Sequence, residues 1–190
     1  MVDIMRFKRL KICLCLLILV LPLGQAAVKA DEEEQGDNLS RHMTRVELVE
    51  VRGISLAPLI NPGDTIKLAY GYYDSHPVER EDIVAYKYAG NDVPIIKFVK
   101  AVPGDKWSLK KDENQDSYQI IVNGHALKNS ENKYYQIHES KIQMLKLYVK
   151  DYPVLPDNTY LILGNKVSGS SDATRFGLID KSDIVGKIVD

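Results

Sequence analysis

The sequence predicts a mostly β domain, antiparallel and built as a sandwich or an irregular barrel, behind an N-terminal membrane-targeting segment. From Val46 onward, short runs rich in β-branched and aromatic residues alternate with turn residues, a pattern typical of strands. Turn signals such as Asn123-Gly124 separate these runs, as in hairpins. Beyond the leader, no stretch shows a long 3.6-residue apolar period with helix caps, so we expect no long helix there.

Residues 1–30 have a charge asymmetry typical of export. Basic side chains at positions 6, 8, 9 and 11 precede an apolar run from Ile12 to Leu23, and acidic residues 31–34 follow it. Positive flanks stay in the cytoplasm, so we expect a cell-membrane protein, single-pass or led by a signal peptide, with its domain extracytoplasmic. As a helix the run would span about 18 Å, short for a hydrocarbon core of about 30 Å. Cleavage of this segment and its retention as an anchor both stay open.

Composition excludes several classes of function. The formal net charge of −1 argues against a nucleic-acid partner. Both cysteines, Cys13 and Cys15, lie in the leader, so the exported part has no disulfide and no cysteine for catalysis or metal binding. The histidines, at positions 42, 76, 125 and 138, lack metal-ligand spacing. We therefore expect no metal and no cofactor.

The rest of the chain divides into a polar linker, residues 31–44, and one domain, residues 45–190. We expect strands over Val46–Val51, Thr65–Tyr70, Ile83–Tyr88, Ile95–Val99, Ser117–Val122, Tyr148–Val149, Tyr160–Leu163 and Ile184–Val189. The turn signals between them are Pro62-Gly63-Asp64, Ala89-Gly90-Asn91-Asp92, Pro103-Gly104-Asp105, Asn123-Gly124 and Pro156-Asp157-Asn158.

The first segment with catalytic potential follows the first strand and reads Gly53-Ile54-Ser55-Leu56-Ala57-Pro58. The proline makes the loop rigid, which would hold a serine hydroxyl in line with a base. Gly53 leaves space for an extended substrate to approach. Taken alone, the segment favours an ordinary serine in a strand-to-turn loop.

The second segment contains a lysine in an apolar run, Val93 to Val99, with Lys97 at its centre. A serine hydroxyl needs a base to take its proton, and lysine serves only if burial lowers its pKa. Taken alone, the more common situation is a lysine whose head reaches water, and we expect this of Lys100. Contact between Ser55 and Lys97 would have to come from the fold.

The third segment, residues 163–177, is a glycine- and serine-rich loop after a strand. It offers a hydroxyl that could orient the lysine amine and a carboxylate that could hold the loop. Composition alone would favour a solvated surface loop.

Together, in this order behind an export leader, the three segments resemble the bacterial type I signal peptidases. Ser55-Leu56-Ala57-Pro58-Leu59 corresponds to the family's Ser-Met-x-Pro-Thr-like motif, and Lys97 precedes the turn Pro103-Gly104-Asp105 as the general-base lysine does. The family's Gly-Asp-Asn…Ser-x-Asp-Ser-Arg-x-x-Gly box aligns without gaps with residues 164–177. Asp82-Ile83-Val84 resembles the family's Gly-Asp-Ile-Val strand, with Glu81 in place of glycine.

The chain departs from the family pattern at several positions. Leu56 and Leu59 replace methionine and threonine, and Asn165-Lys166 stands where the family has Asp-Asn. Ala173-Thr174 replaces Ser-Arg, which displaces Arg175 by one residue. Gly53 removes a possible side-chain oxyanion donor and leaves the backbone N–H of Ser55.

The resemblance implies a signal-peptidase-like fold and a serine endopeptidase that cleaves signal peptides from exported preproteins. It implies Ser55 as nucleophile, Lys97 as base, Ser170 and Asp172 as supporting residues, and small residues at the first and third substrate positions before the cut. Two alternatives stay open: a peptidase dedicated to one substrate, such as a pilin or a conjugation protein, and a non-catalytic assembly partner. The sequence does not indicate the oligomeric state.

Overall fold

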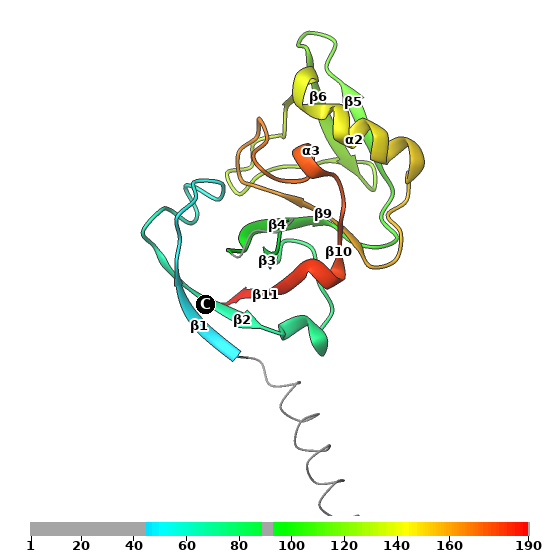
Figure 1. Cartoon of the computed structure of the whole chain (residues 1–190). Helices are drawn as coiled ribbons and strands as arrows, with labels where there is room; N and C mark the ends of the chain where they lie inside the picture. The colour runs from blue at the N-terminus through cyan, green and yellow to red at the C-terminus, as the bar shows by residue number, and fades with distance from the viewer. Residues whose placement is uncertain (1–44, 89–92, 190) are drawn as a thin grey trace, which may run out of the picture. The chain divides into compact units, whose positions relative to one another are not determined.

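The computed structural model describes residues 45–88 and 93–189, which contain two antiparallel β-sheets (Figure 1). The larger sheet has seven strands in the order β1-β2-β11-β3-β4-β9-β10. Their bounds are β1 Arg45–Glu50, β2 Thr65–Tyr70, β3 Ile83–Tyr86, β4 Ile95–Ala101, β9 Thr159–Leu163, β10 Ile179–Asp180 and β11 Ile184–Val189. Every neighbouring pair is antiparallel.

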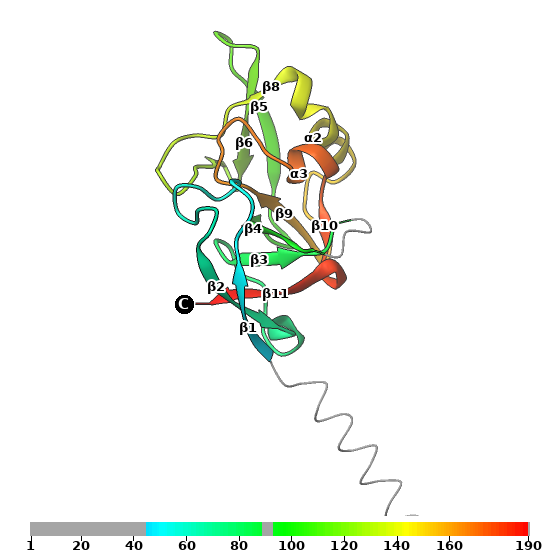
Figure 2. The ribbon, with the colours of Figure 1, turned by 60° about the vertical axis from the view of Figure 1, so that its left-hand side comes forward.

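The smaller sheet and the helices come from the middle and the end of the chain. Its four strands are β5 Trp107–Lys111, β6 Ser117–Val122, β7 His125–Ala126 and β8 Ile137–His138. Helix α2, Glu139–Asp151, packs against β5, β6 and the short helix α3, Ala173–Phe176 (Figure 2). The 3-10 turns η1, Tyr72–Asp74, and η2, Lys181–Asp183, complete the elements of the described residues. The predicted fold class, mostly antiparallel β, is confirmed.

Most predicted strands are confirmed. Those at 65–70, 117–122 and 184–189 have the predicted bounds, and the other confirmed strands differ by one or two residues at an end. The Asn123-Gly124 turn joins β6 and β7 with φ of 50° and 82°, as a two-residue hairpin turn requires. The leader, the linker and the turn at 89–92 lie outside the described residues. Within 45–88 and 93–189, no helix has the length and apolar character needed to span a bilayer.

The expectation of no long helix was wrong, and so was the strand at Tyr148–Val149, because both residues lie in α2. Ile142 and Leu145 are fully buried on one face of this helix, with the three-residue spacing of an amphipathic helix. The helix begins after His138, whose ring accepts the Ser140 N–H. Histidine is an unusual N-cap, and the β-branched and aromatic pair at 148–149 masked the period.

The core around the segment that contains Ser55 is small and local. Val51, Leu56 and Ile60 bury their side chains against Phe98 of β4. A separate and larger cluster lies between α2, the smaller sheet and β9; it includes Trp107 of β5, a strand that the sequence analysis missed. Burial of Leu56, which is 1% exposed, therefore ties the residue after Ser55 directly to β4.

The expectation that the Lys100 amine reaches water was wrong. Lys100 is buried at the end of β4, with 2% of its surface exposed. Its amine donates to both carboxylate oxygens of Glu81, at 3.0 and 2.7 Å, and to the carbonyl of Lys128 at 3.1 Å. Glu81 has φ of 68°, a left-handed conformation that costs a non-glycine residue about 1–2 kcal/mol. The ion pair with Lys100 offsets that strain.

This balance predicts that Glu81→Gly destabilises the native chain but stabilises a Lys100→Met variant. In the native chain the substitution relieves backbone strain but leaves the buried amine without its carboxylate, so we expect unfolding free energy to fall by about 1 kcal/mol. In a Lys100→Met background only the strain relief remains, and we expect Glu81→Gly to raise the free energy of unfolding by about 1 kcal/mol. Denaturant melts of the native protein, the two single variants and the double variant measure both effects. Equal effects in the two backgrounds would contradict the pairing.

Candidate active site

The fold brings Ser55 and Lys97 into direct contact, although 42 residues separate them in the chain. The Lys97 amine donates to the Ser55 hydroxyl at 2.8 Å, within normal hydrogen-bond distance. Ser55 lies in the loop after β1, which is closed by bonds from Val51 N to Asp64 O and from Gly63 N to Val51 O. Lys97 is inside β4, between β3 and β9. An interior strand of the sheet thus presents the amine to a fixed loop.

Burial sets the proton affinity of Lys97. The side chain is 2% exposed, and besides Ser55 its amine donates to the carbonyl of Ile96 at 2.8 Å. Desolvation lowers the pKa of Lys97 to about 8, while the charge of Asp172 acts in the opposite direction. A substantial fraction of the amine is therefore neutral near physiological pH and able to accept a proton.

Asp172 organises the third segment from a fully buried position. Its Oδ2 accepts the N–H of Gly164 at 2.9 Å, and the N–H and hydroxyl of Ser170 at 3.2 and 2.6 Å. Its Oδ1 accepts the N–H and hydroxyl of Thr174 at 3.0 and 2.7 Å. These bonds hold both ends of the loop around one carboxylate and stabilise its charge.

Ser170 lies in the same network. Its hydroxyl donates to Asp172, whereas the hydrogen bonds of the Lys97 amine among the described residues go to Ser55 and Ile96. The backbone nevertheless brings Ser170 close to the nucleophile loop: a Cβ on Gly164 would collide with the Ser170 hydroxyl and lie 2.9 Å from the Ser55 carbonyl oxygen. Direct orientation of the Lys97 amine by Ser170 stays a prediction.

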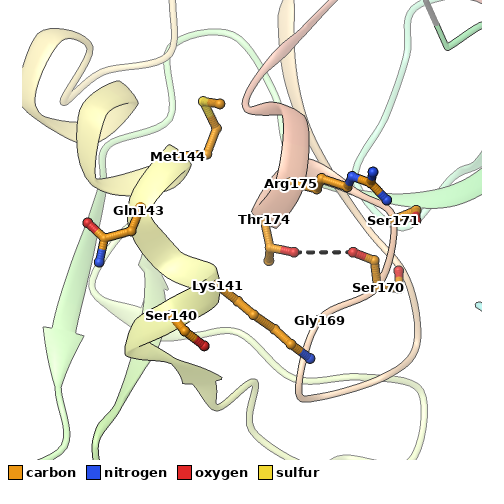
Figure 3. Close-up of a pocket in the computed structure, with 9 residues that line it drawn as sticks. All are labelled: Ser140, Lys141, Gln143, Met144, Gly169, Ser170, Ser171, Thr174 and Arg175. Carbon is orange, nitrogen blue, oxygen red and sulfur yellow. Dashed lines mark hydrogen bonds between the residues drawn. The ribbon is translucent and has the colours of Figure 1, made fainter.

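Arg175, displaced relative to the family box, makes no ion pair with Asp172 among the described residues. The Thr174 hydroxyl donates a hydrogen bond to that carboxylate instead. Arg175 is exposed and lines a cavity of about 460 Å³ between α2 and the third segment (Figure 3). The lining residues are Ser140, Lys141, Gln143, Met144, Gly169, Ser170, Ser171, Thr174 and Arg175. Ser170 and Thr174 are the members of this lining that also donate hydrogen bonds to Asp172.

Sequence reasoning missed two residues that hold the third segment in place. The Tyr135 hydroxyl donates to the carbonyl of Gly164 at 2.7 Å, and the N–H of Asn165 donates to the carbonyl of Ser55 at 2.6 Å. Both bonds end on backbone atoms, so no residue pattern signals them. The sequence marked Asn165 only as a departure from the family box.

Within the described ranges, no group of three histidine, cysteine or acidic side chains is arranged to hold a metal ion. The chemistry available at the contact of Ser55 and Lys97 is that of a hydroxyl nucleophile and an amine base.

Comparisons with known proteins identify the family. A family described as "Signal peptidase, peptidase S26" matches residues 39–189. Signal peptidase IB of Staphylococcus aureus (strain COL) is 30% identical over 146 residues, which cover 73% of each chain. A protein named "Inactive signal peptidase IA", from Staphylococcus aureus (strain MRSA252), is 26% identical over 133 residues, covering 70% of this chain and 71% of its own.

Among solved structures, a signal peptidase I from Enterococcus faecalis V583 superposes with a TM-score of 0.41 and 21% identity, covering 60% of this chain and 98% of the other. The family match extends over nearly the whole of the described domain, and a relative at 30% identity covers almost three quarters of the chain. The chain therefore belongs to the signal peptidase family, peptidase S26, and is a serine endopeptidase of the signal peptidase I type.

Proposed function

We propose that the protein cleaves signal peptides from exported preproteins through an acyl-enzyme, with Ser55 as nucleophile and Lys97 as general base. The 2.8 Å contact between the Ser55 hydroxyl and a buried Lys97 amine carries the proposal. It combines the two requirements of this chemistry: a base within reach of the nucleophile's proton, and an environment that leaves the base unprotonated.

The reaction proceeds in two halves. Neutral Lys97 takes the Ser55 proton as Oγ attacks the scissile carbonyl, and the resulting ammonium then protonates the leaving amine as the peptide C–N bond breaks. The product is an ester between Ser55 and the signal peptide. Lys97, neutral again, takes a proton from water; the hydroxide attacks the ester, and the proton returns to Ser55 Oγ as the signal peptide leaves.

The backbone N–H of Ser55 is the proposed oxyanion donor. Among the described residues this N–H has no hydrogen-bond acceptor, so it is available to a substrate oxygen. A Cβ on Gly53 would meet no atom within 4 Å. The open space beside Gly53 supports the approach of an extended peptide along the chain that leads to Ser55.

Ser170 and Asp172 are proposed as supporting residues. Asp172 holds the Ser170 backbone and hydroxyl beside the Ser55 loop, from where Ser170 orients the Lys97 amine. The negative charge of Asp172 acts to raise the pKa of Lys97, against the larger effect of burial. The same charge is stabilised by the five hydrogen bonds that Asp172 accepts.

Preference for small residues at the first and third positions before the cut, and location at the cell membrane with an extracytoplasmic domain, also belong to this proposal. The first rests on family membership. The second rests on the charge asymmetry of residues 1–34. Assays on several unrelated preproteins discriminate a general peptidase from one dedicated to a single pilin or conjugation protein.

A non-catalytic role is the alternative, because one relative is named inactive. The contact between Ser55 and Lys97 argues against it for this chain. A protein retained only as an assembly partner has no requirement for a buried lysine with a lowered pKa, which is costly to folding.

We predict that Ser55→Ala and Lys97→Met each lower kcat/KM on a model preprotein by at least about 10³-fold, because each removes a member of the dyad. Lys100→Met is the matched control. Lys100 is a lysine of the same strand with the same 2% exposure, but it contacts Glu81 instead of the serine. Its variant should keep activity within about threefold per folded molecule. Turnover by either dyad variant comparable to the native protein would refute the mechanism.

The pH dependence of kcat/KM tests the state of Lys97. Activity requires the neutral amine, so it should rise with pH to a plateau with a midpoint near 8, the pKa to which burial lowers Lys97. Initial rates on a model preprotein between pH 6 and pH 10.5, in buffers of constant ionic strength, give this midpoint. A midpoint above about 10, that of an ordinary lysine, would mean that the lysine is not desolvated in solution.

Lys97→Met should stabilise the fold while abolishing activity. Below pH 8 the amine is charged in both states, and the folded state carries the full cost of burying it. Between pH 8 and 10.5 only the unfolded state still binds the proton, so native stability rises with pH. We expect the variant to be more stable by about 1–3 kcal/mol at pH 7 and to lose this advantage by pH 10.5. Denaturant melts at both pH values measure it, and an advantage unaffected by pH would contradict the assignment.

A further inference from the structure

We infer that Asn165 is a positioning residue of the proposed Ser55–Lys97 site, holding the nucleophile loop by its backbone N–H and its side-chain amide together. The inference rests on the proposed function, because a positioning role has meaning only where Ser55 is the nucleophile. It assigns a role to a position that the sequence marked only as a substitution in the family box.

Two hydrogen bonds link Asn165 to the Ser55 loop. Its N–H donates to the Ser55 carbonyl at 2.6 Å, and its Nδ2 donates to the Ala57 carbonyl at 3.0 Å. These carbonyls flank Leu56, whose side chain is buried against Phe98. The Ser55-Leu56 and Ala57-Pro58 peptide groups are therefore both held by one residue, and with them the direction in which Ser55 projects its hydroxyl.

The other side of Asn165 is attached to the segment between β7 and β8. Its Oδ1 accepts the N–H of Ser130 at 2.9 Å, and its carbonyl accepts the Asn129 Nδ2 at 2.9 Å. Asn165 is 2% exposed, so water cannot replace these partners readily. The site requires a side chain with one donor and one acceptor on the same planar group, and asparagine provides both.

Charge is the second reason for an amide at this position. A carboxylate here would accept from Ser130 but could not donate to Ala57, so two oxygens would face each other in a buried site. It would also place a negative charge beside the Ser55 loop. A nearby negative charge favours the protonated amine, and Asp172 already acts on Lys97 in that direction. Asn165 thus holds the nucleophile without adding a second buried carboxylate.

The test compares two isosteric substitutions, Asn165→Asp and Asn123→Asp. Both residues are asparagines whose Oδ1 accepts a backbone N–H and whose Nδ2 donates to an oxygen atom. Only the first donates to the Ser55 loop, because Asn123 lies in the turn between β6 and β7 and bonds to Lys106 and Asp105. The readouts are kcat and KM on a model preprotein, the pH midpoint of kcat/KM, and the urea midpoint as a measure of stability.

For Asn165→Asp we expect a roughly 10- to 100-fold loss concentrated in kcat, since small misplacements of a nucleophile are costly, and a pH midpoint moved upward. For Asn123→Asp we expect kcat within about threefold and an unmoved pH midpoint, despite a loss in urea midpoint, because its new carboxylate would face that of Asp105. Asn165→Ala removes the side-chain bonds without adding charge, so it should lose kcat without moving the midpoint. If Asn165→Asp does not fold, the kcat of Asn165→Ala decides the test.

Native kcat and an unmoved midpoint in both Asn165 variants would overturn the inference. So would equal losses of kcat in the Asn123 and Asn165 variants, because the effect would then follow stability alone. Ser55→Ala in the same assay separates the two proposals. If that variant keeps turnover, the proposed mechanism fails; if it is inactive while the Asn165 variants are fully active, only the positioning role fails.

Discussion

The structure depends on a lysine amine that is withdrawn from water and held against a serine hydroxyl. Burying an ammonium is unfavourable, and a fold that does so must be stable enough elsewhere to bear the cost. Here Lys97 lies in β4, a strand that pairs with β3 and β9 of a seven-stranded sheet, and Lys97 itself pairs with Val84 of β3. The sheet provides rigidity, and the lowered pKa of Lys97 follows from burial.

The loops around the amine are arranged so that polar groups are satisfied without adding charge. Asp172 is the buried carboxylate whose charge acts on the pKa of Lys97, and it accepts hydrogen bonds from five donors. Thr174 takes part in this set, so the displaced Arg175 is not needed to satisfy the carboxylate. Asn165 completes the arrangement with a neutral amide. The divergence of the third segment is thus accommodated locally, by a hydroxyl and an amide in place of charged groups.

Much of the fold and of the candidate site could be predicted from sequence, because strands and turns leave local patterns and Ser55 and Lys97 lie in recognisable segments. Contact between them could not be derived from spacing, since it requires β4 to pair between strands from distant parts of the chain. Helix α2 was missed because its apolar period is short and its cap is a histidine. The bonds of Tyr135 and Asn165 were missed because they end on backbone carbonyls, which any sequence possesses. Burial of Lys100 depended on a partner, Glu81, that lies 19 positions earlier in the chain.

The most direct test of this account is an NMR titration of the Lys97 amine in the folded protein, with isotope-labelled lysine and assignment by loss of the signal in Lys97→Met. The account predicts a single titration with a midpoint near pH 8, well below the other lysines, because burial disfavours the charged amine. A midpoint near 10.4, the value of a lysine in water, would show that the amine stays hydrated and protonated at neutral pH. That result would contradict the proposed role of Lys97 as the base.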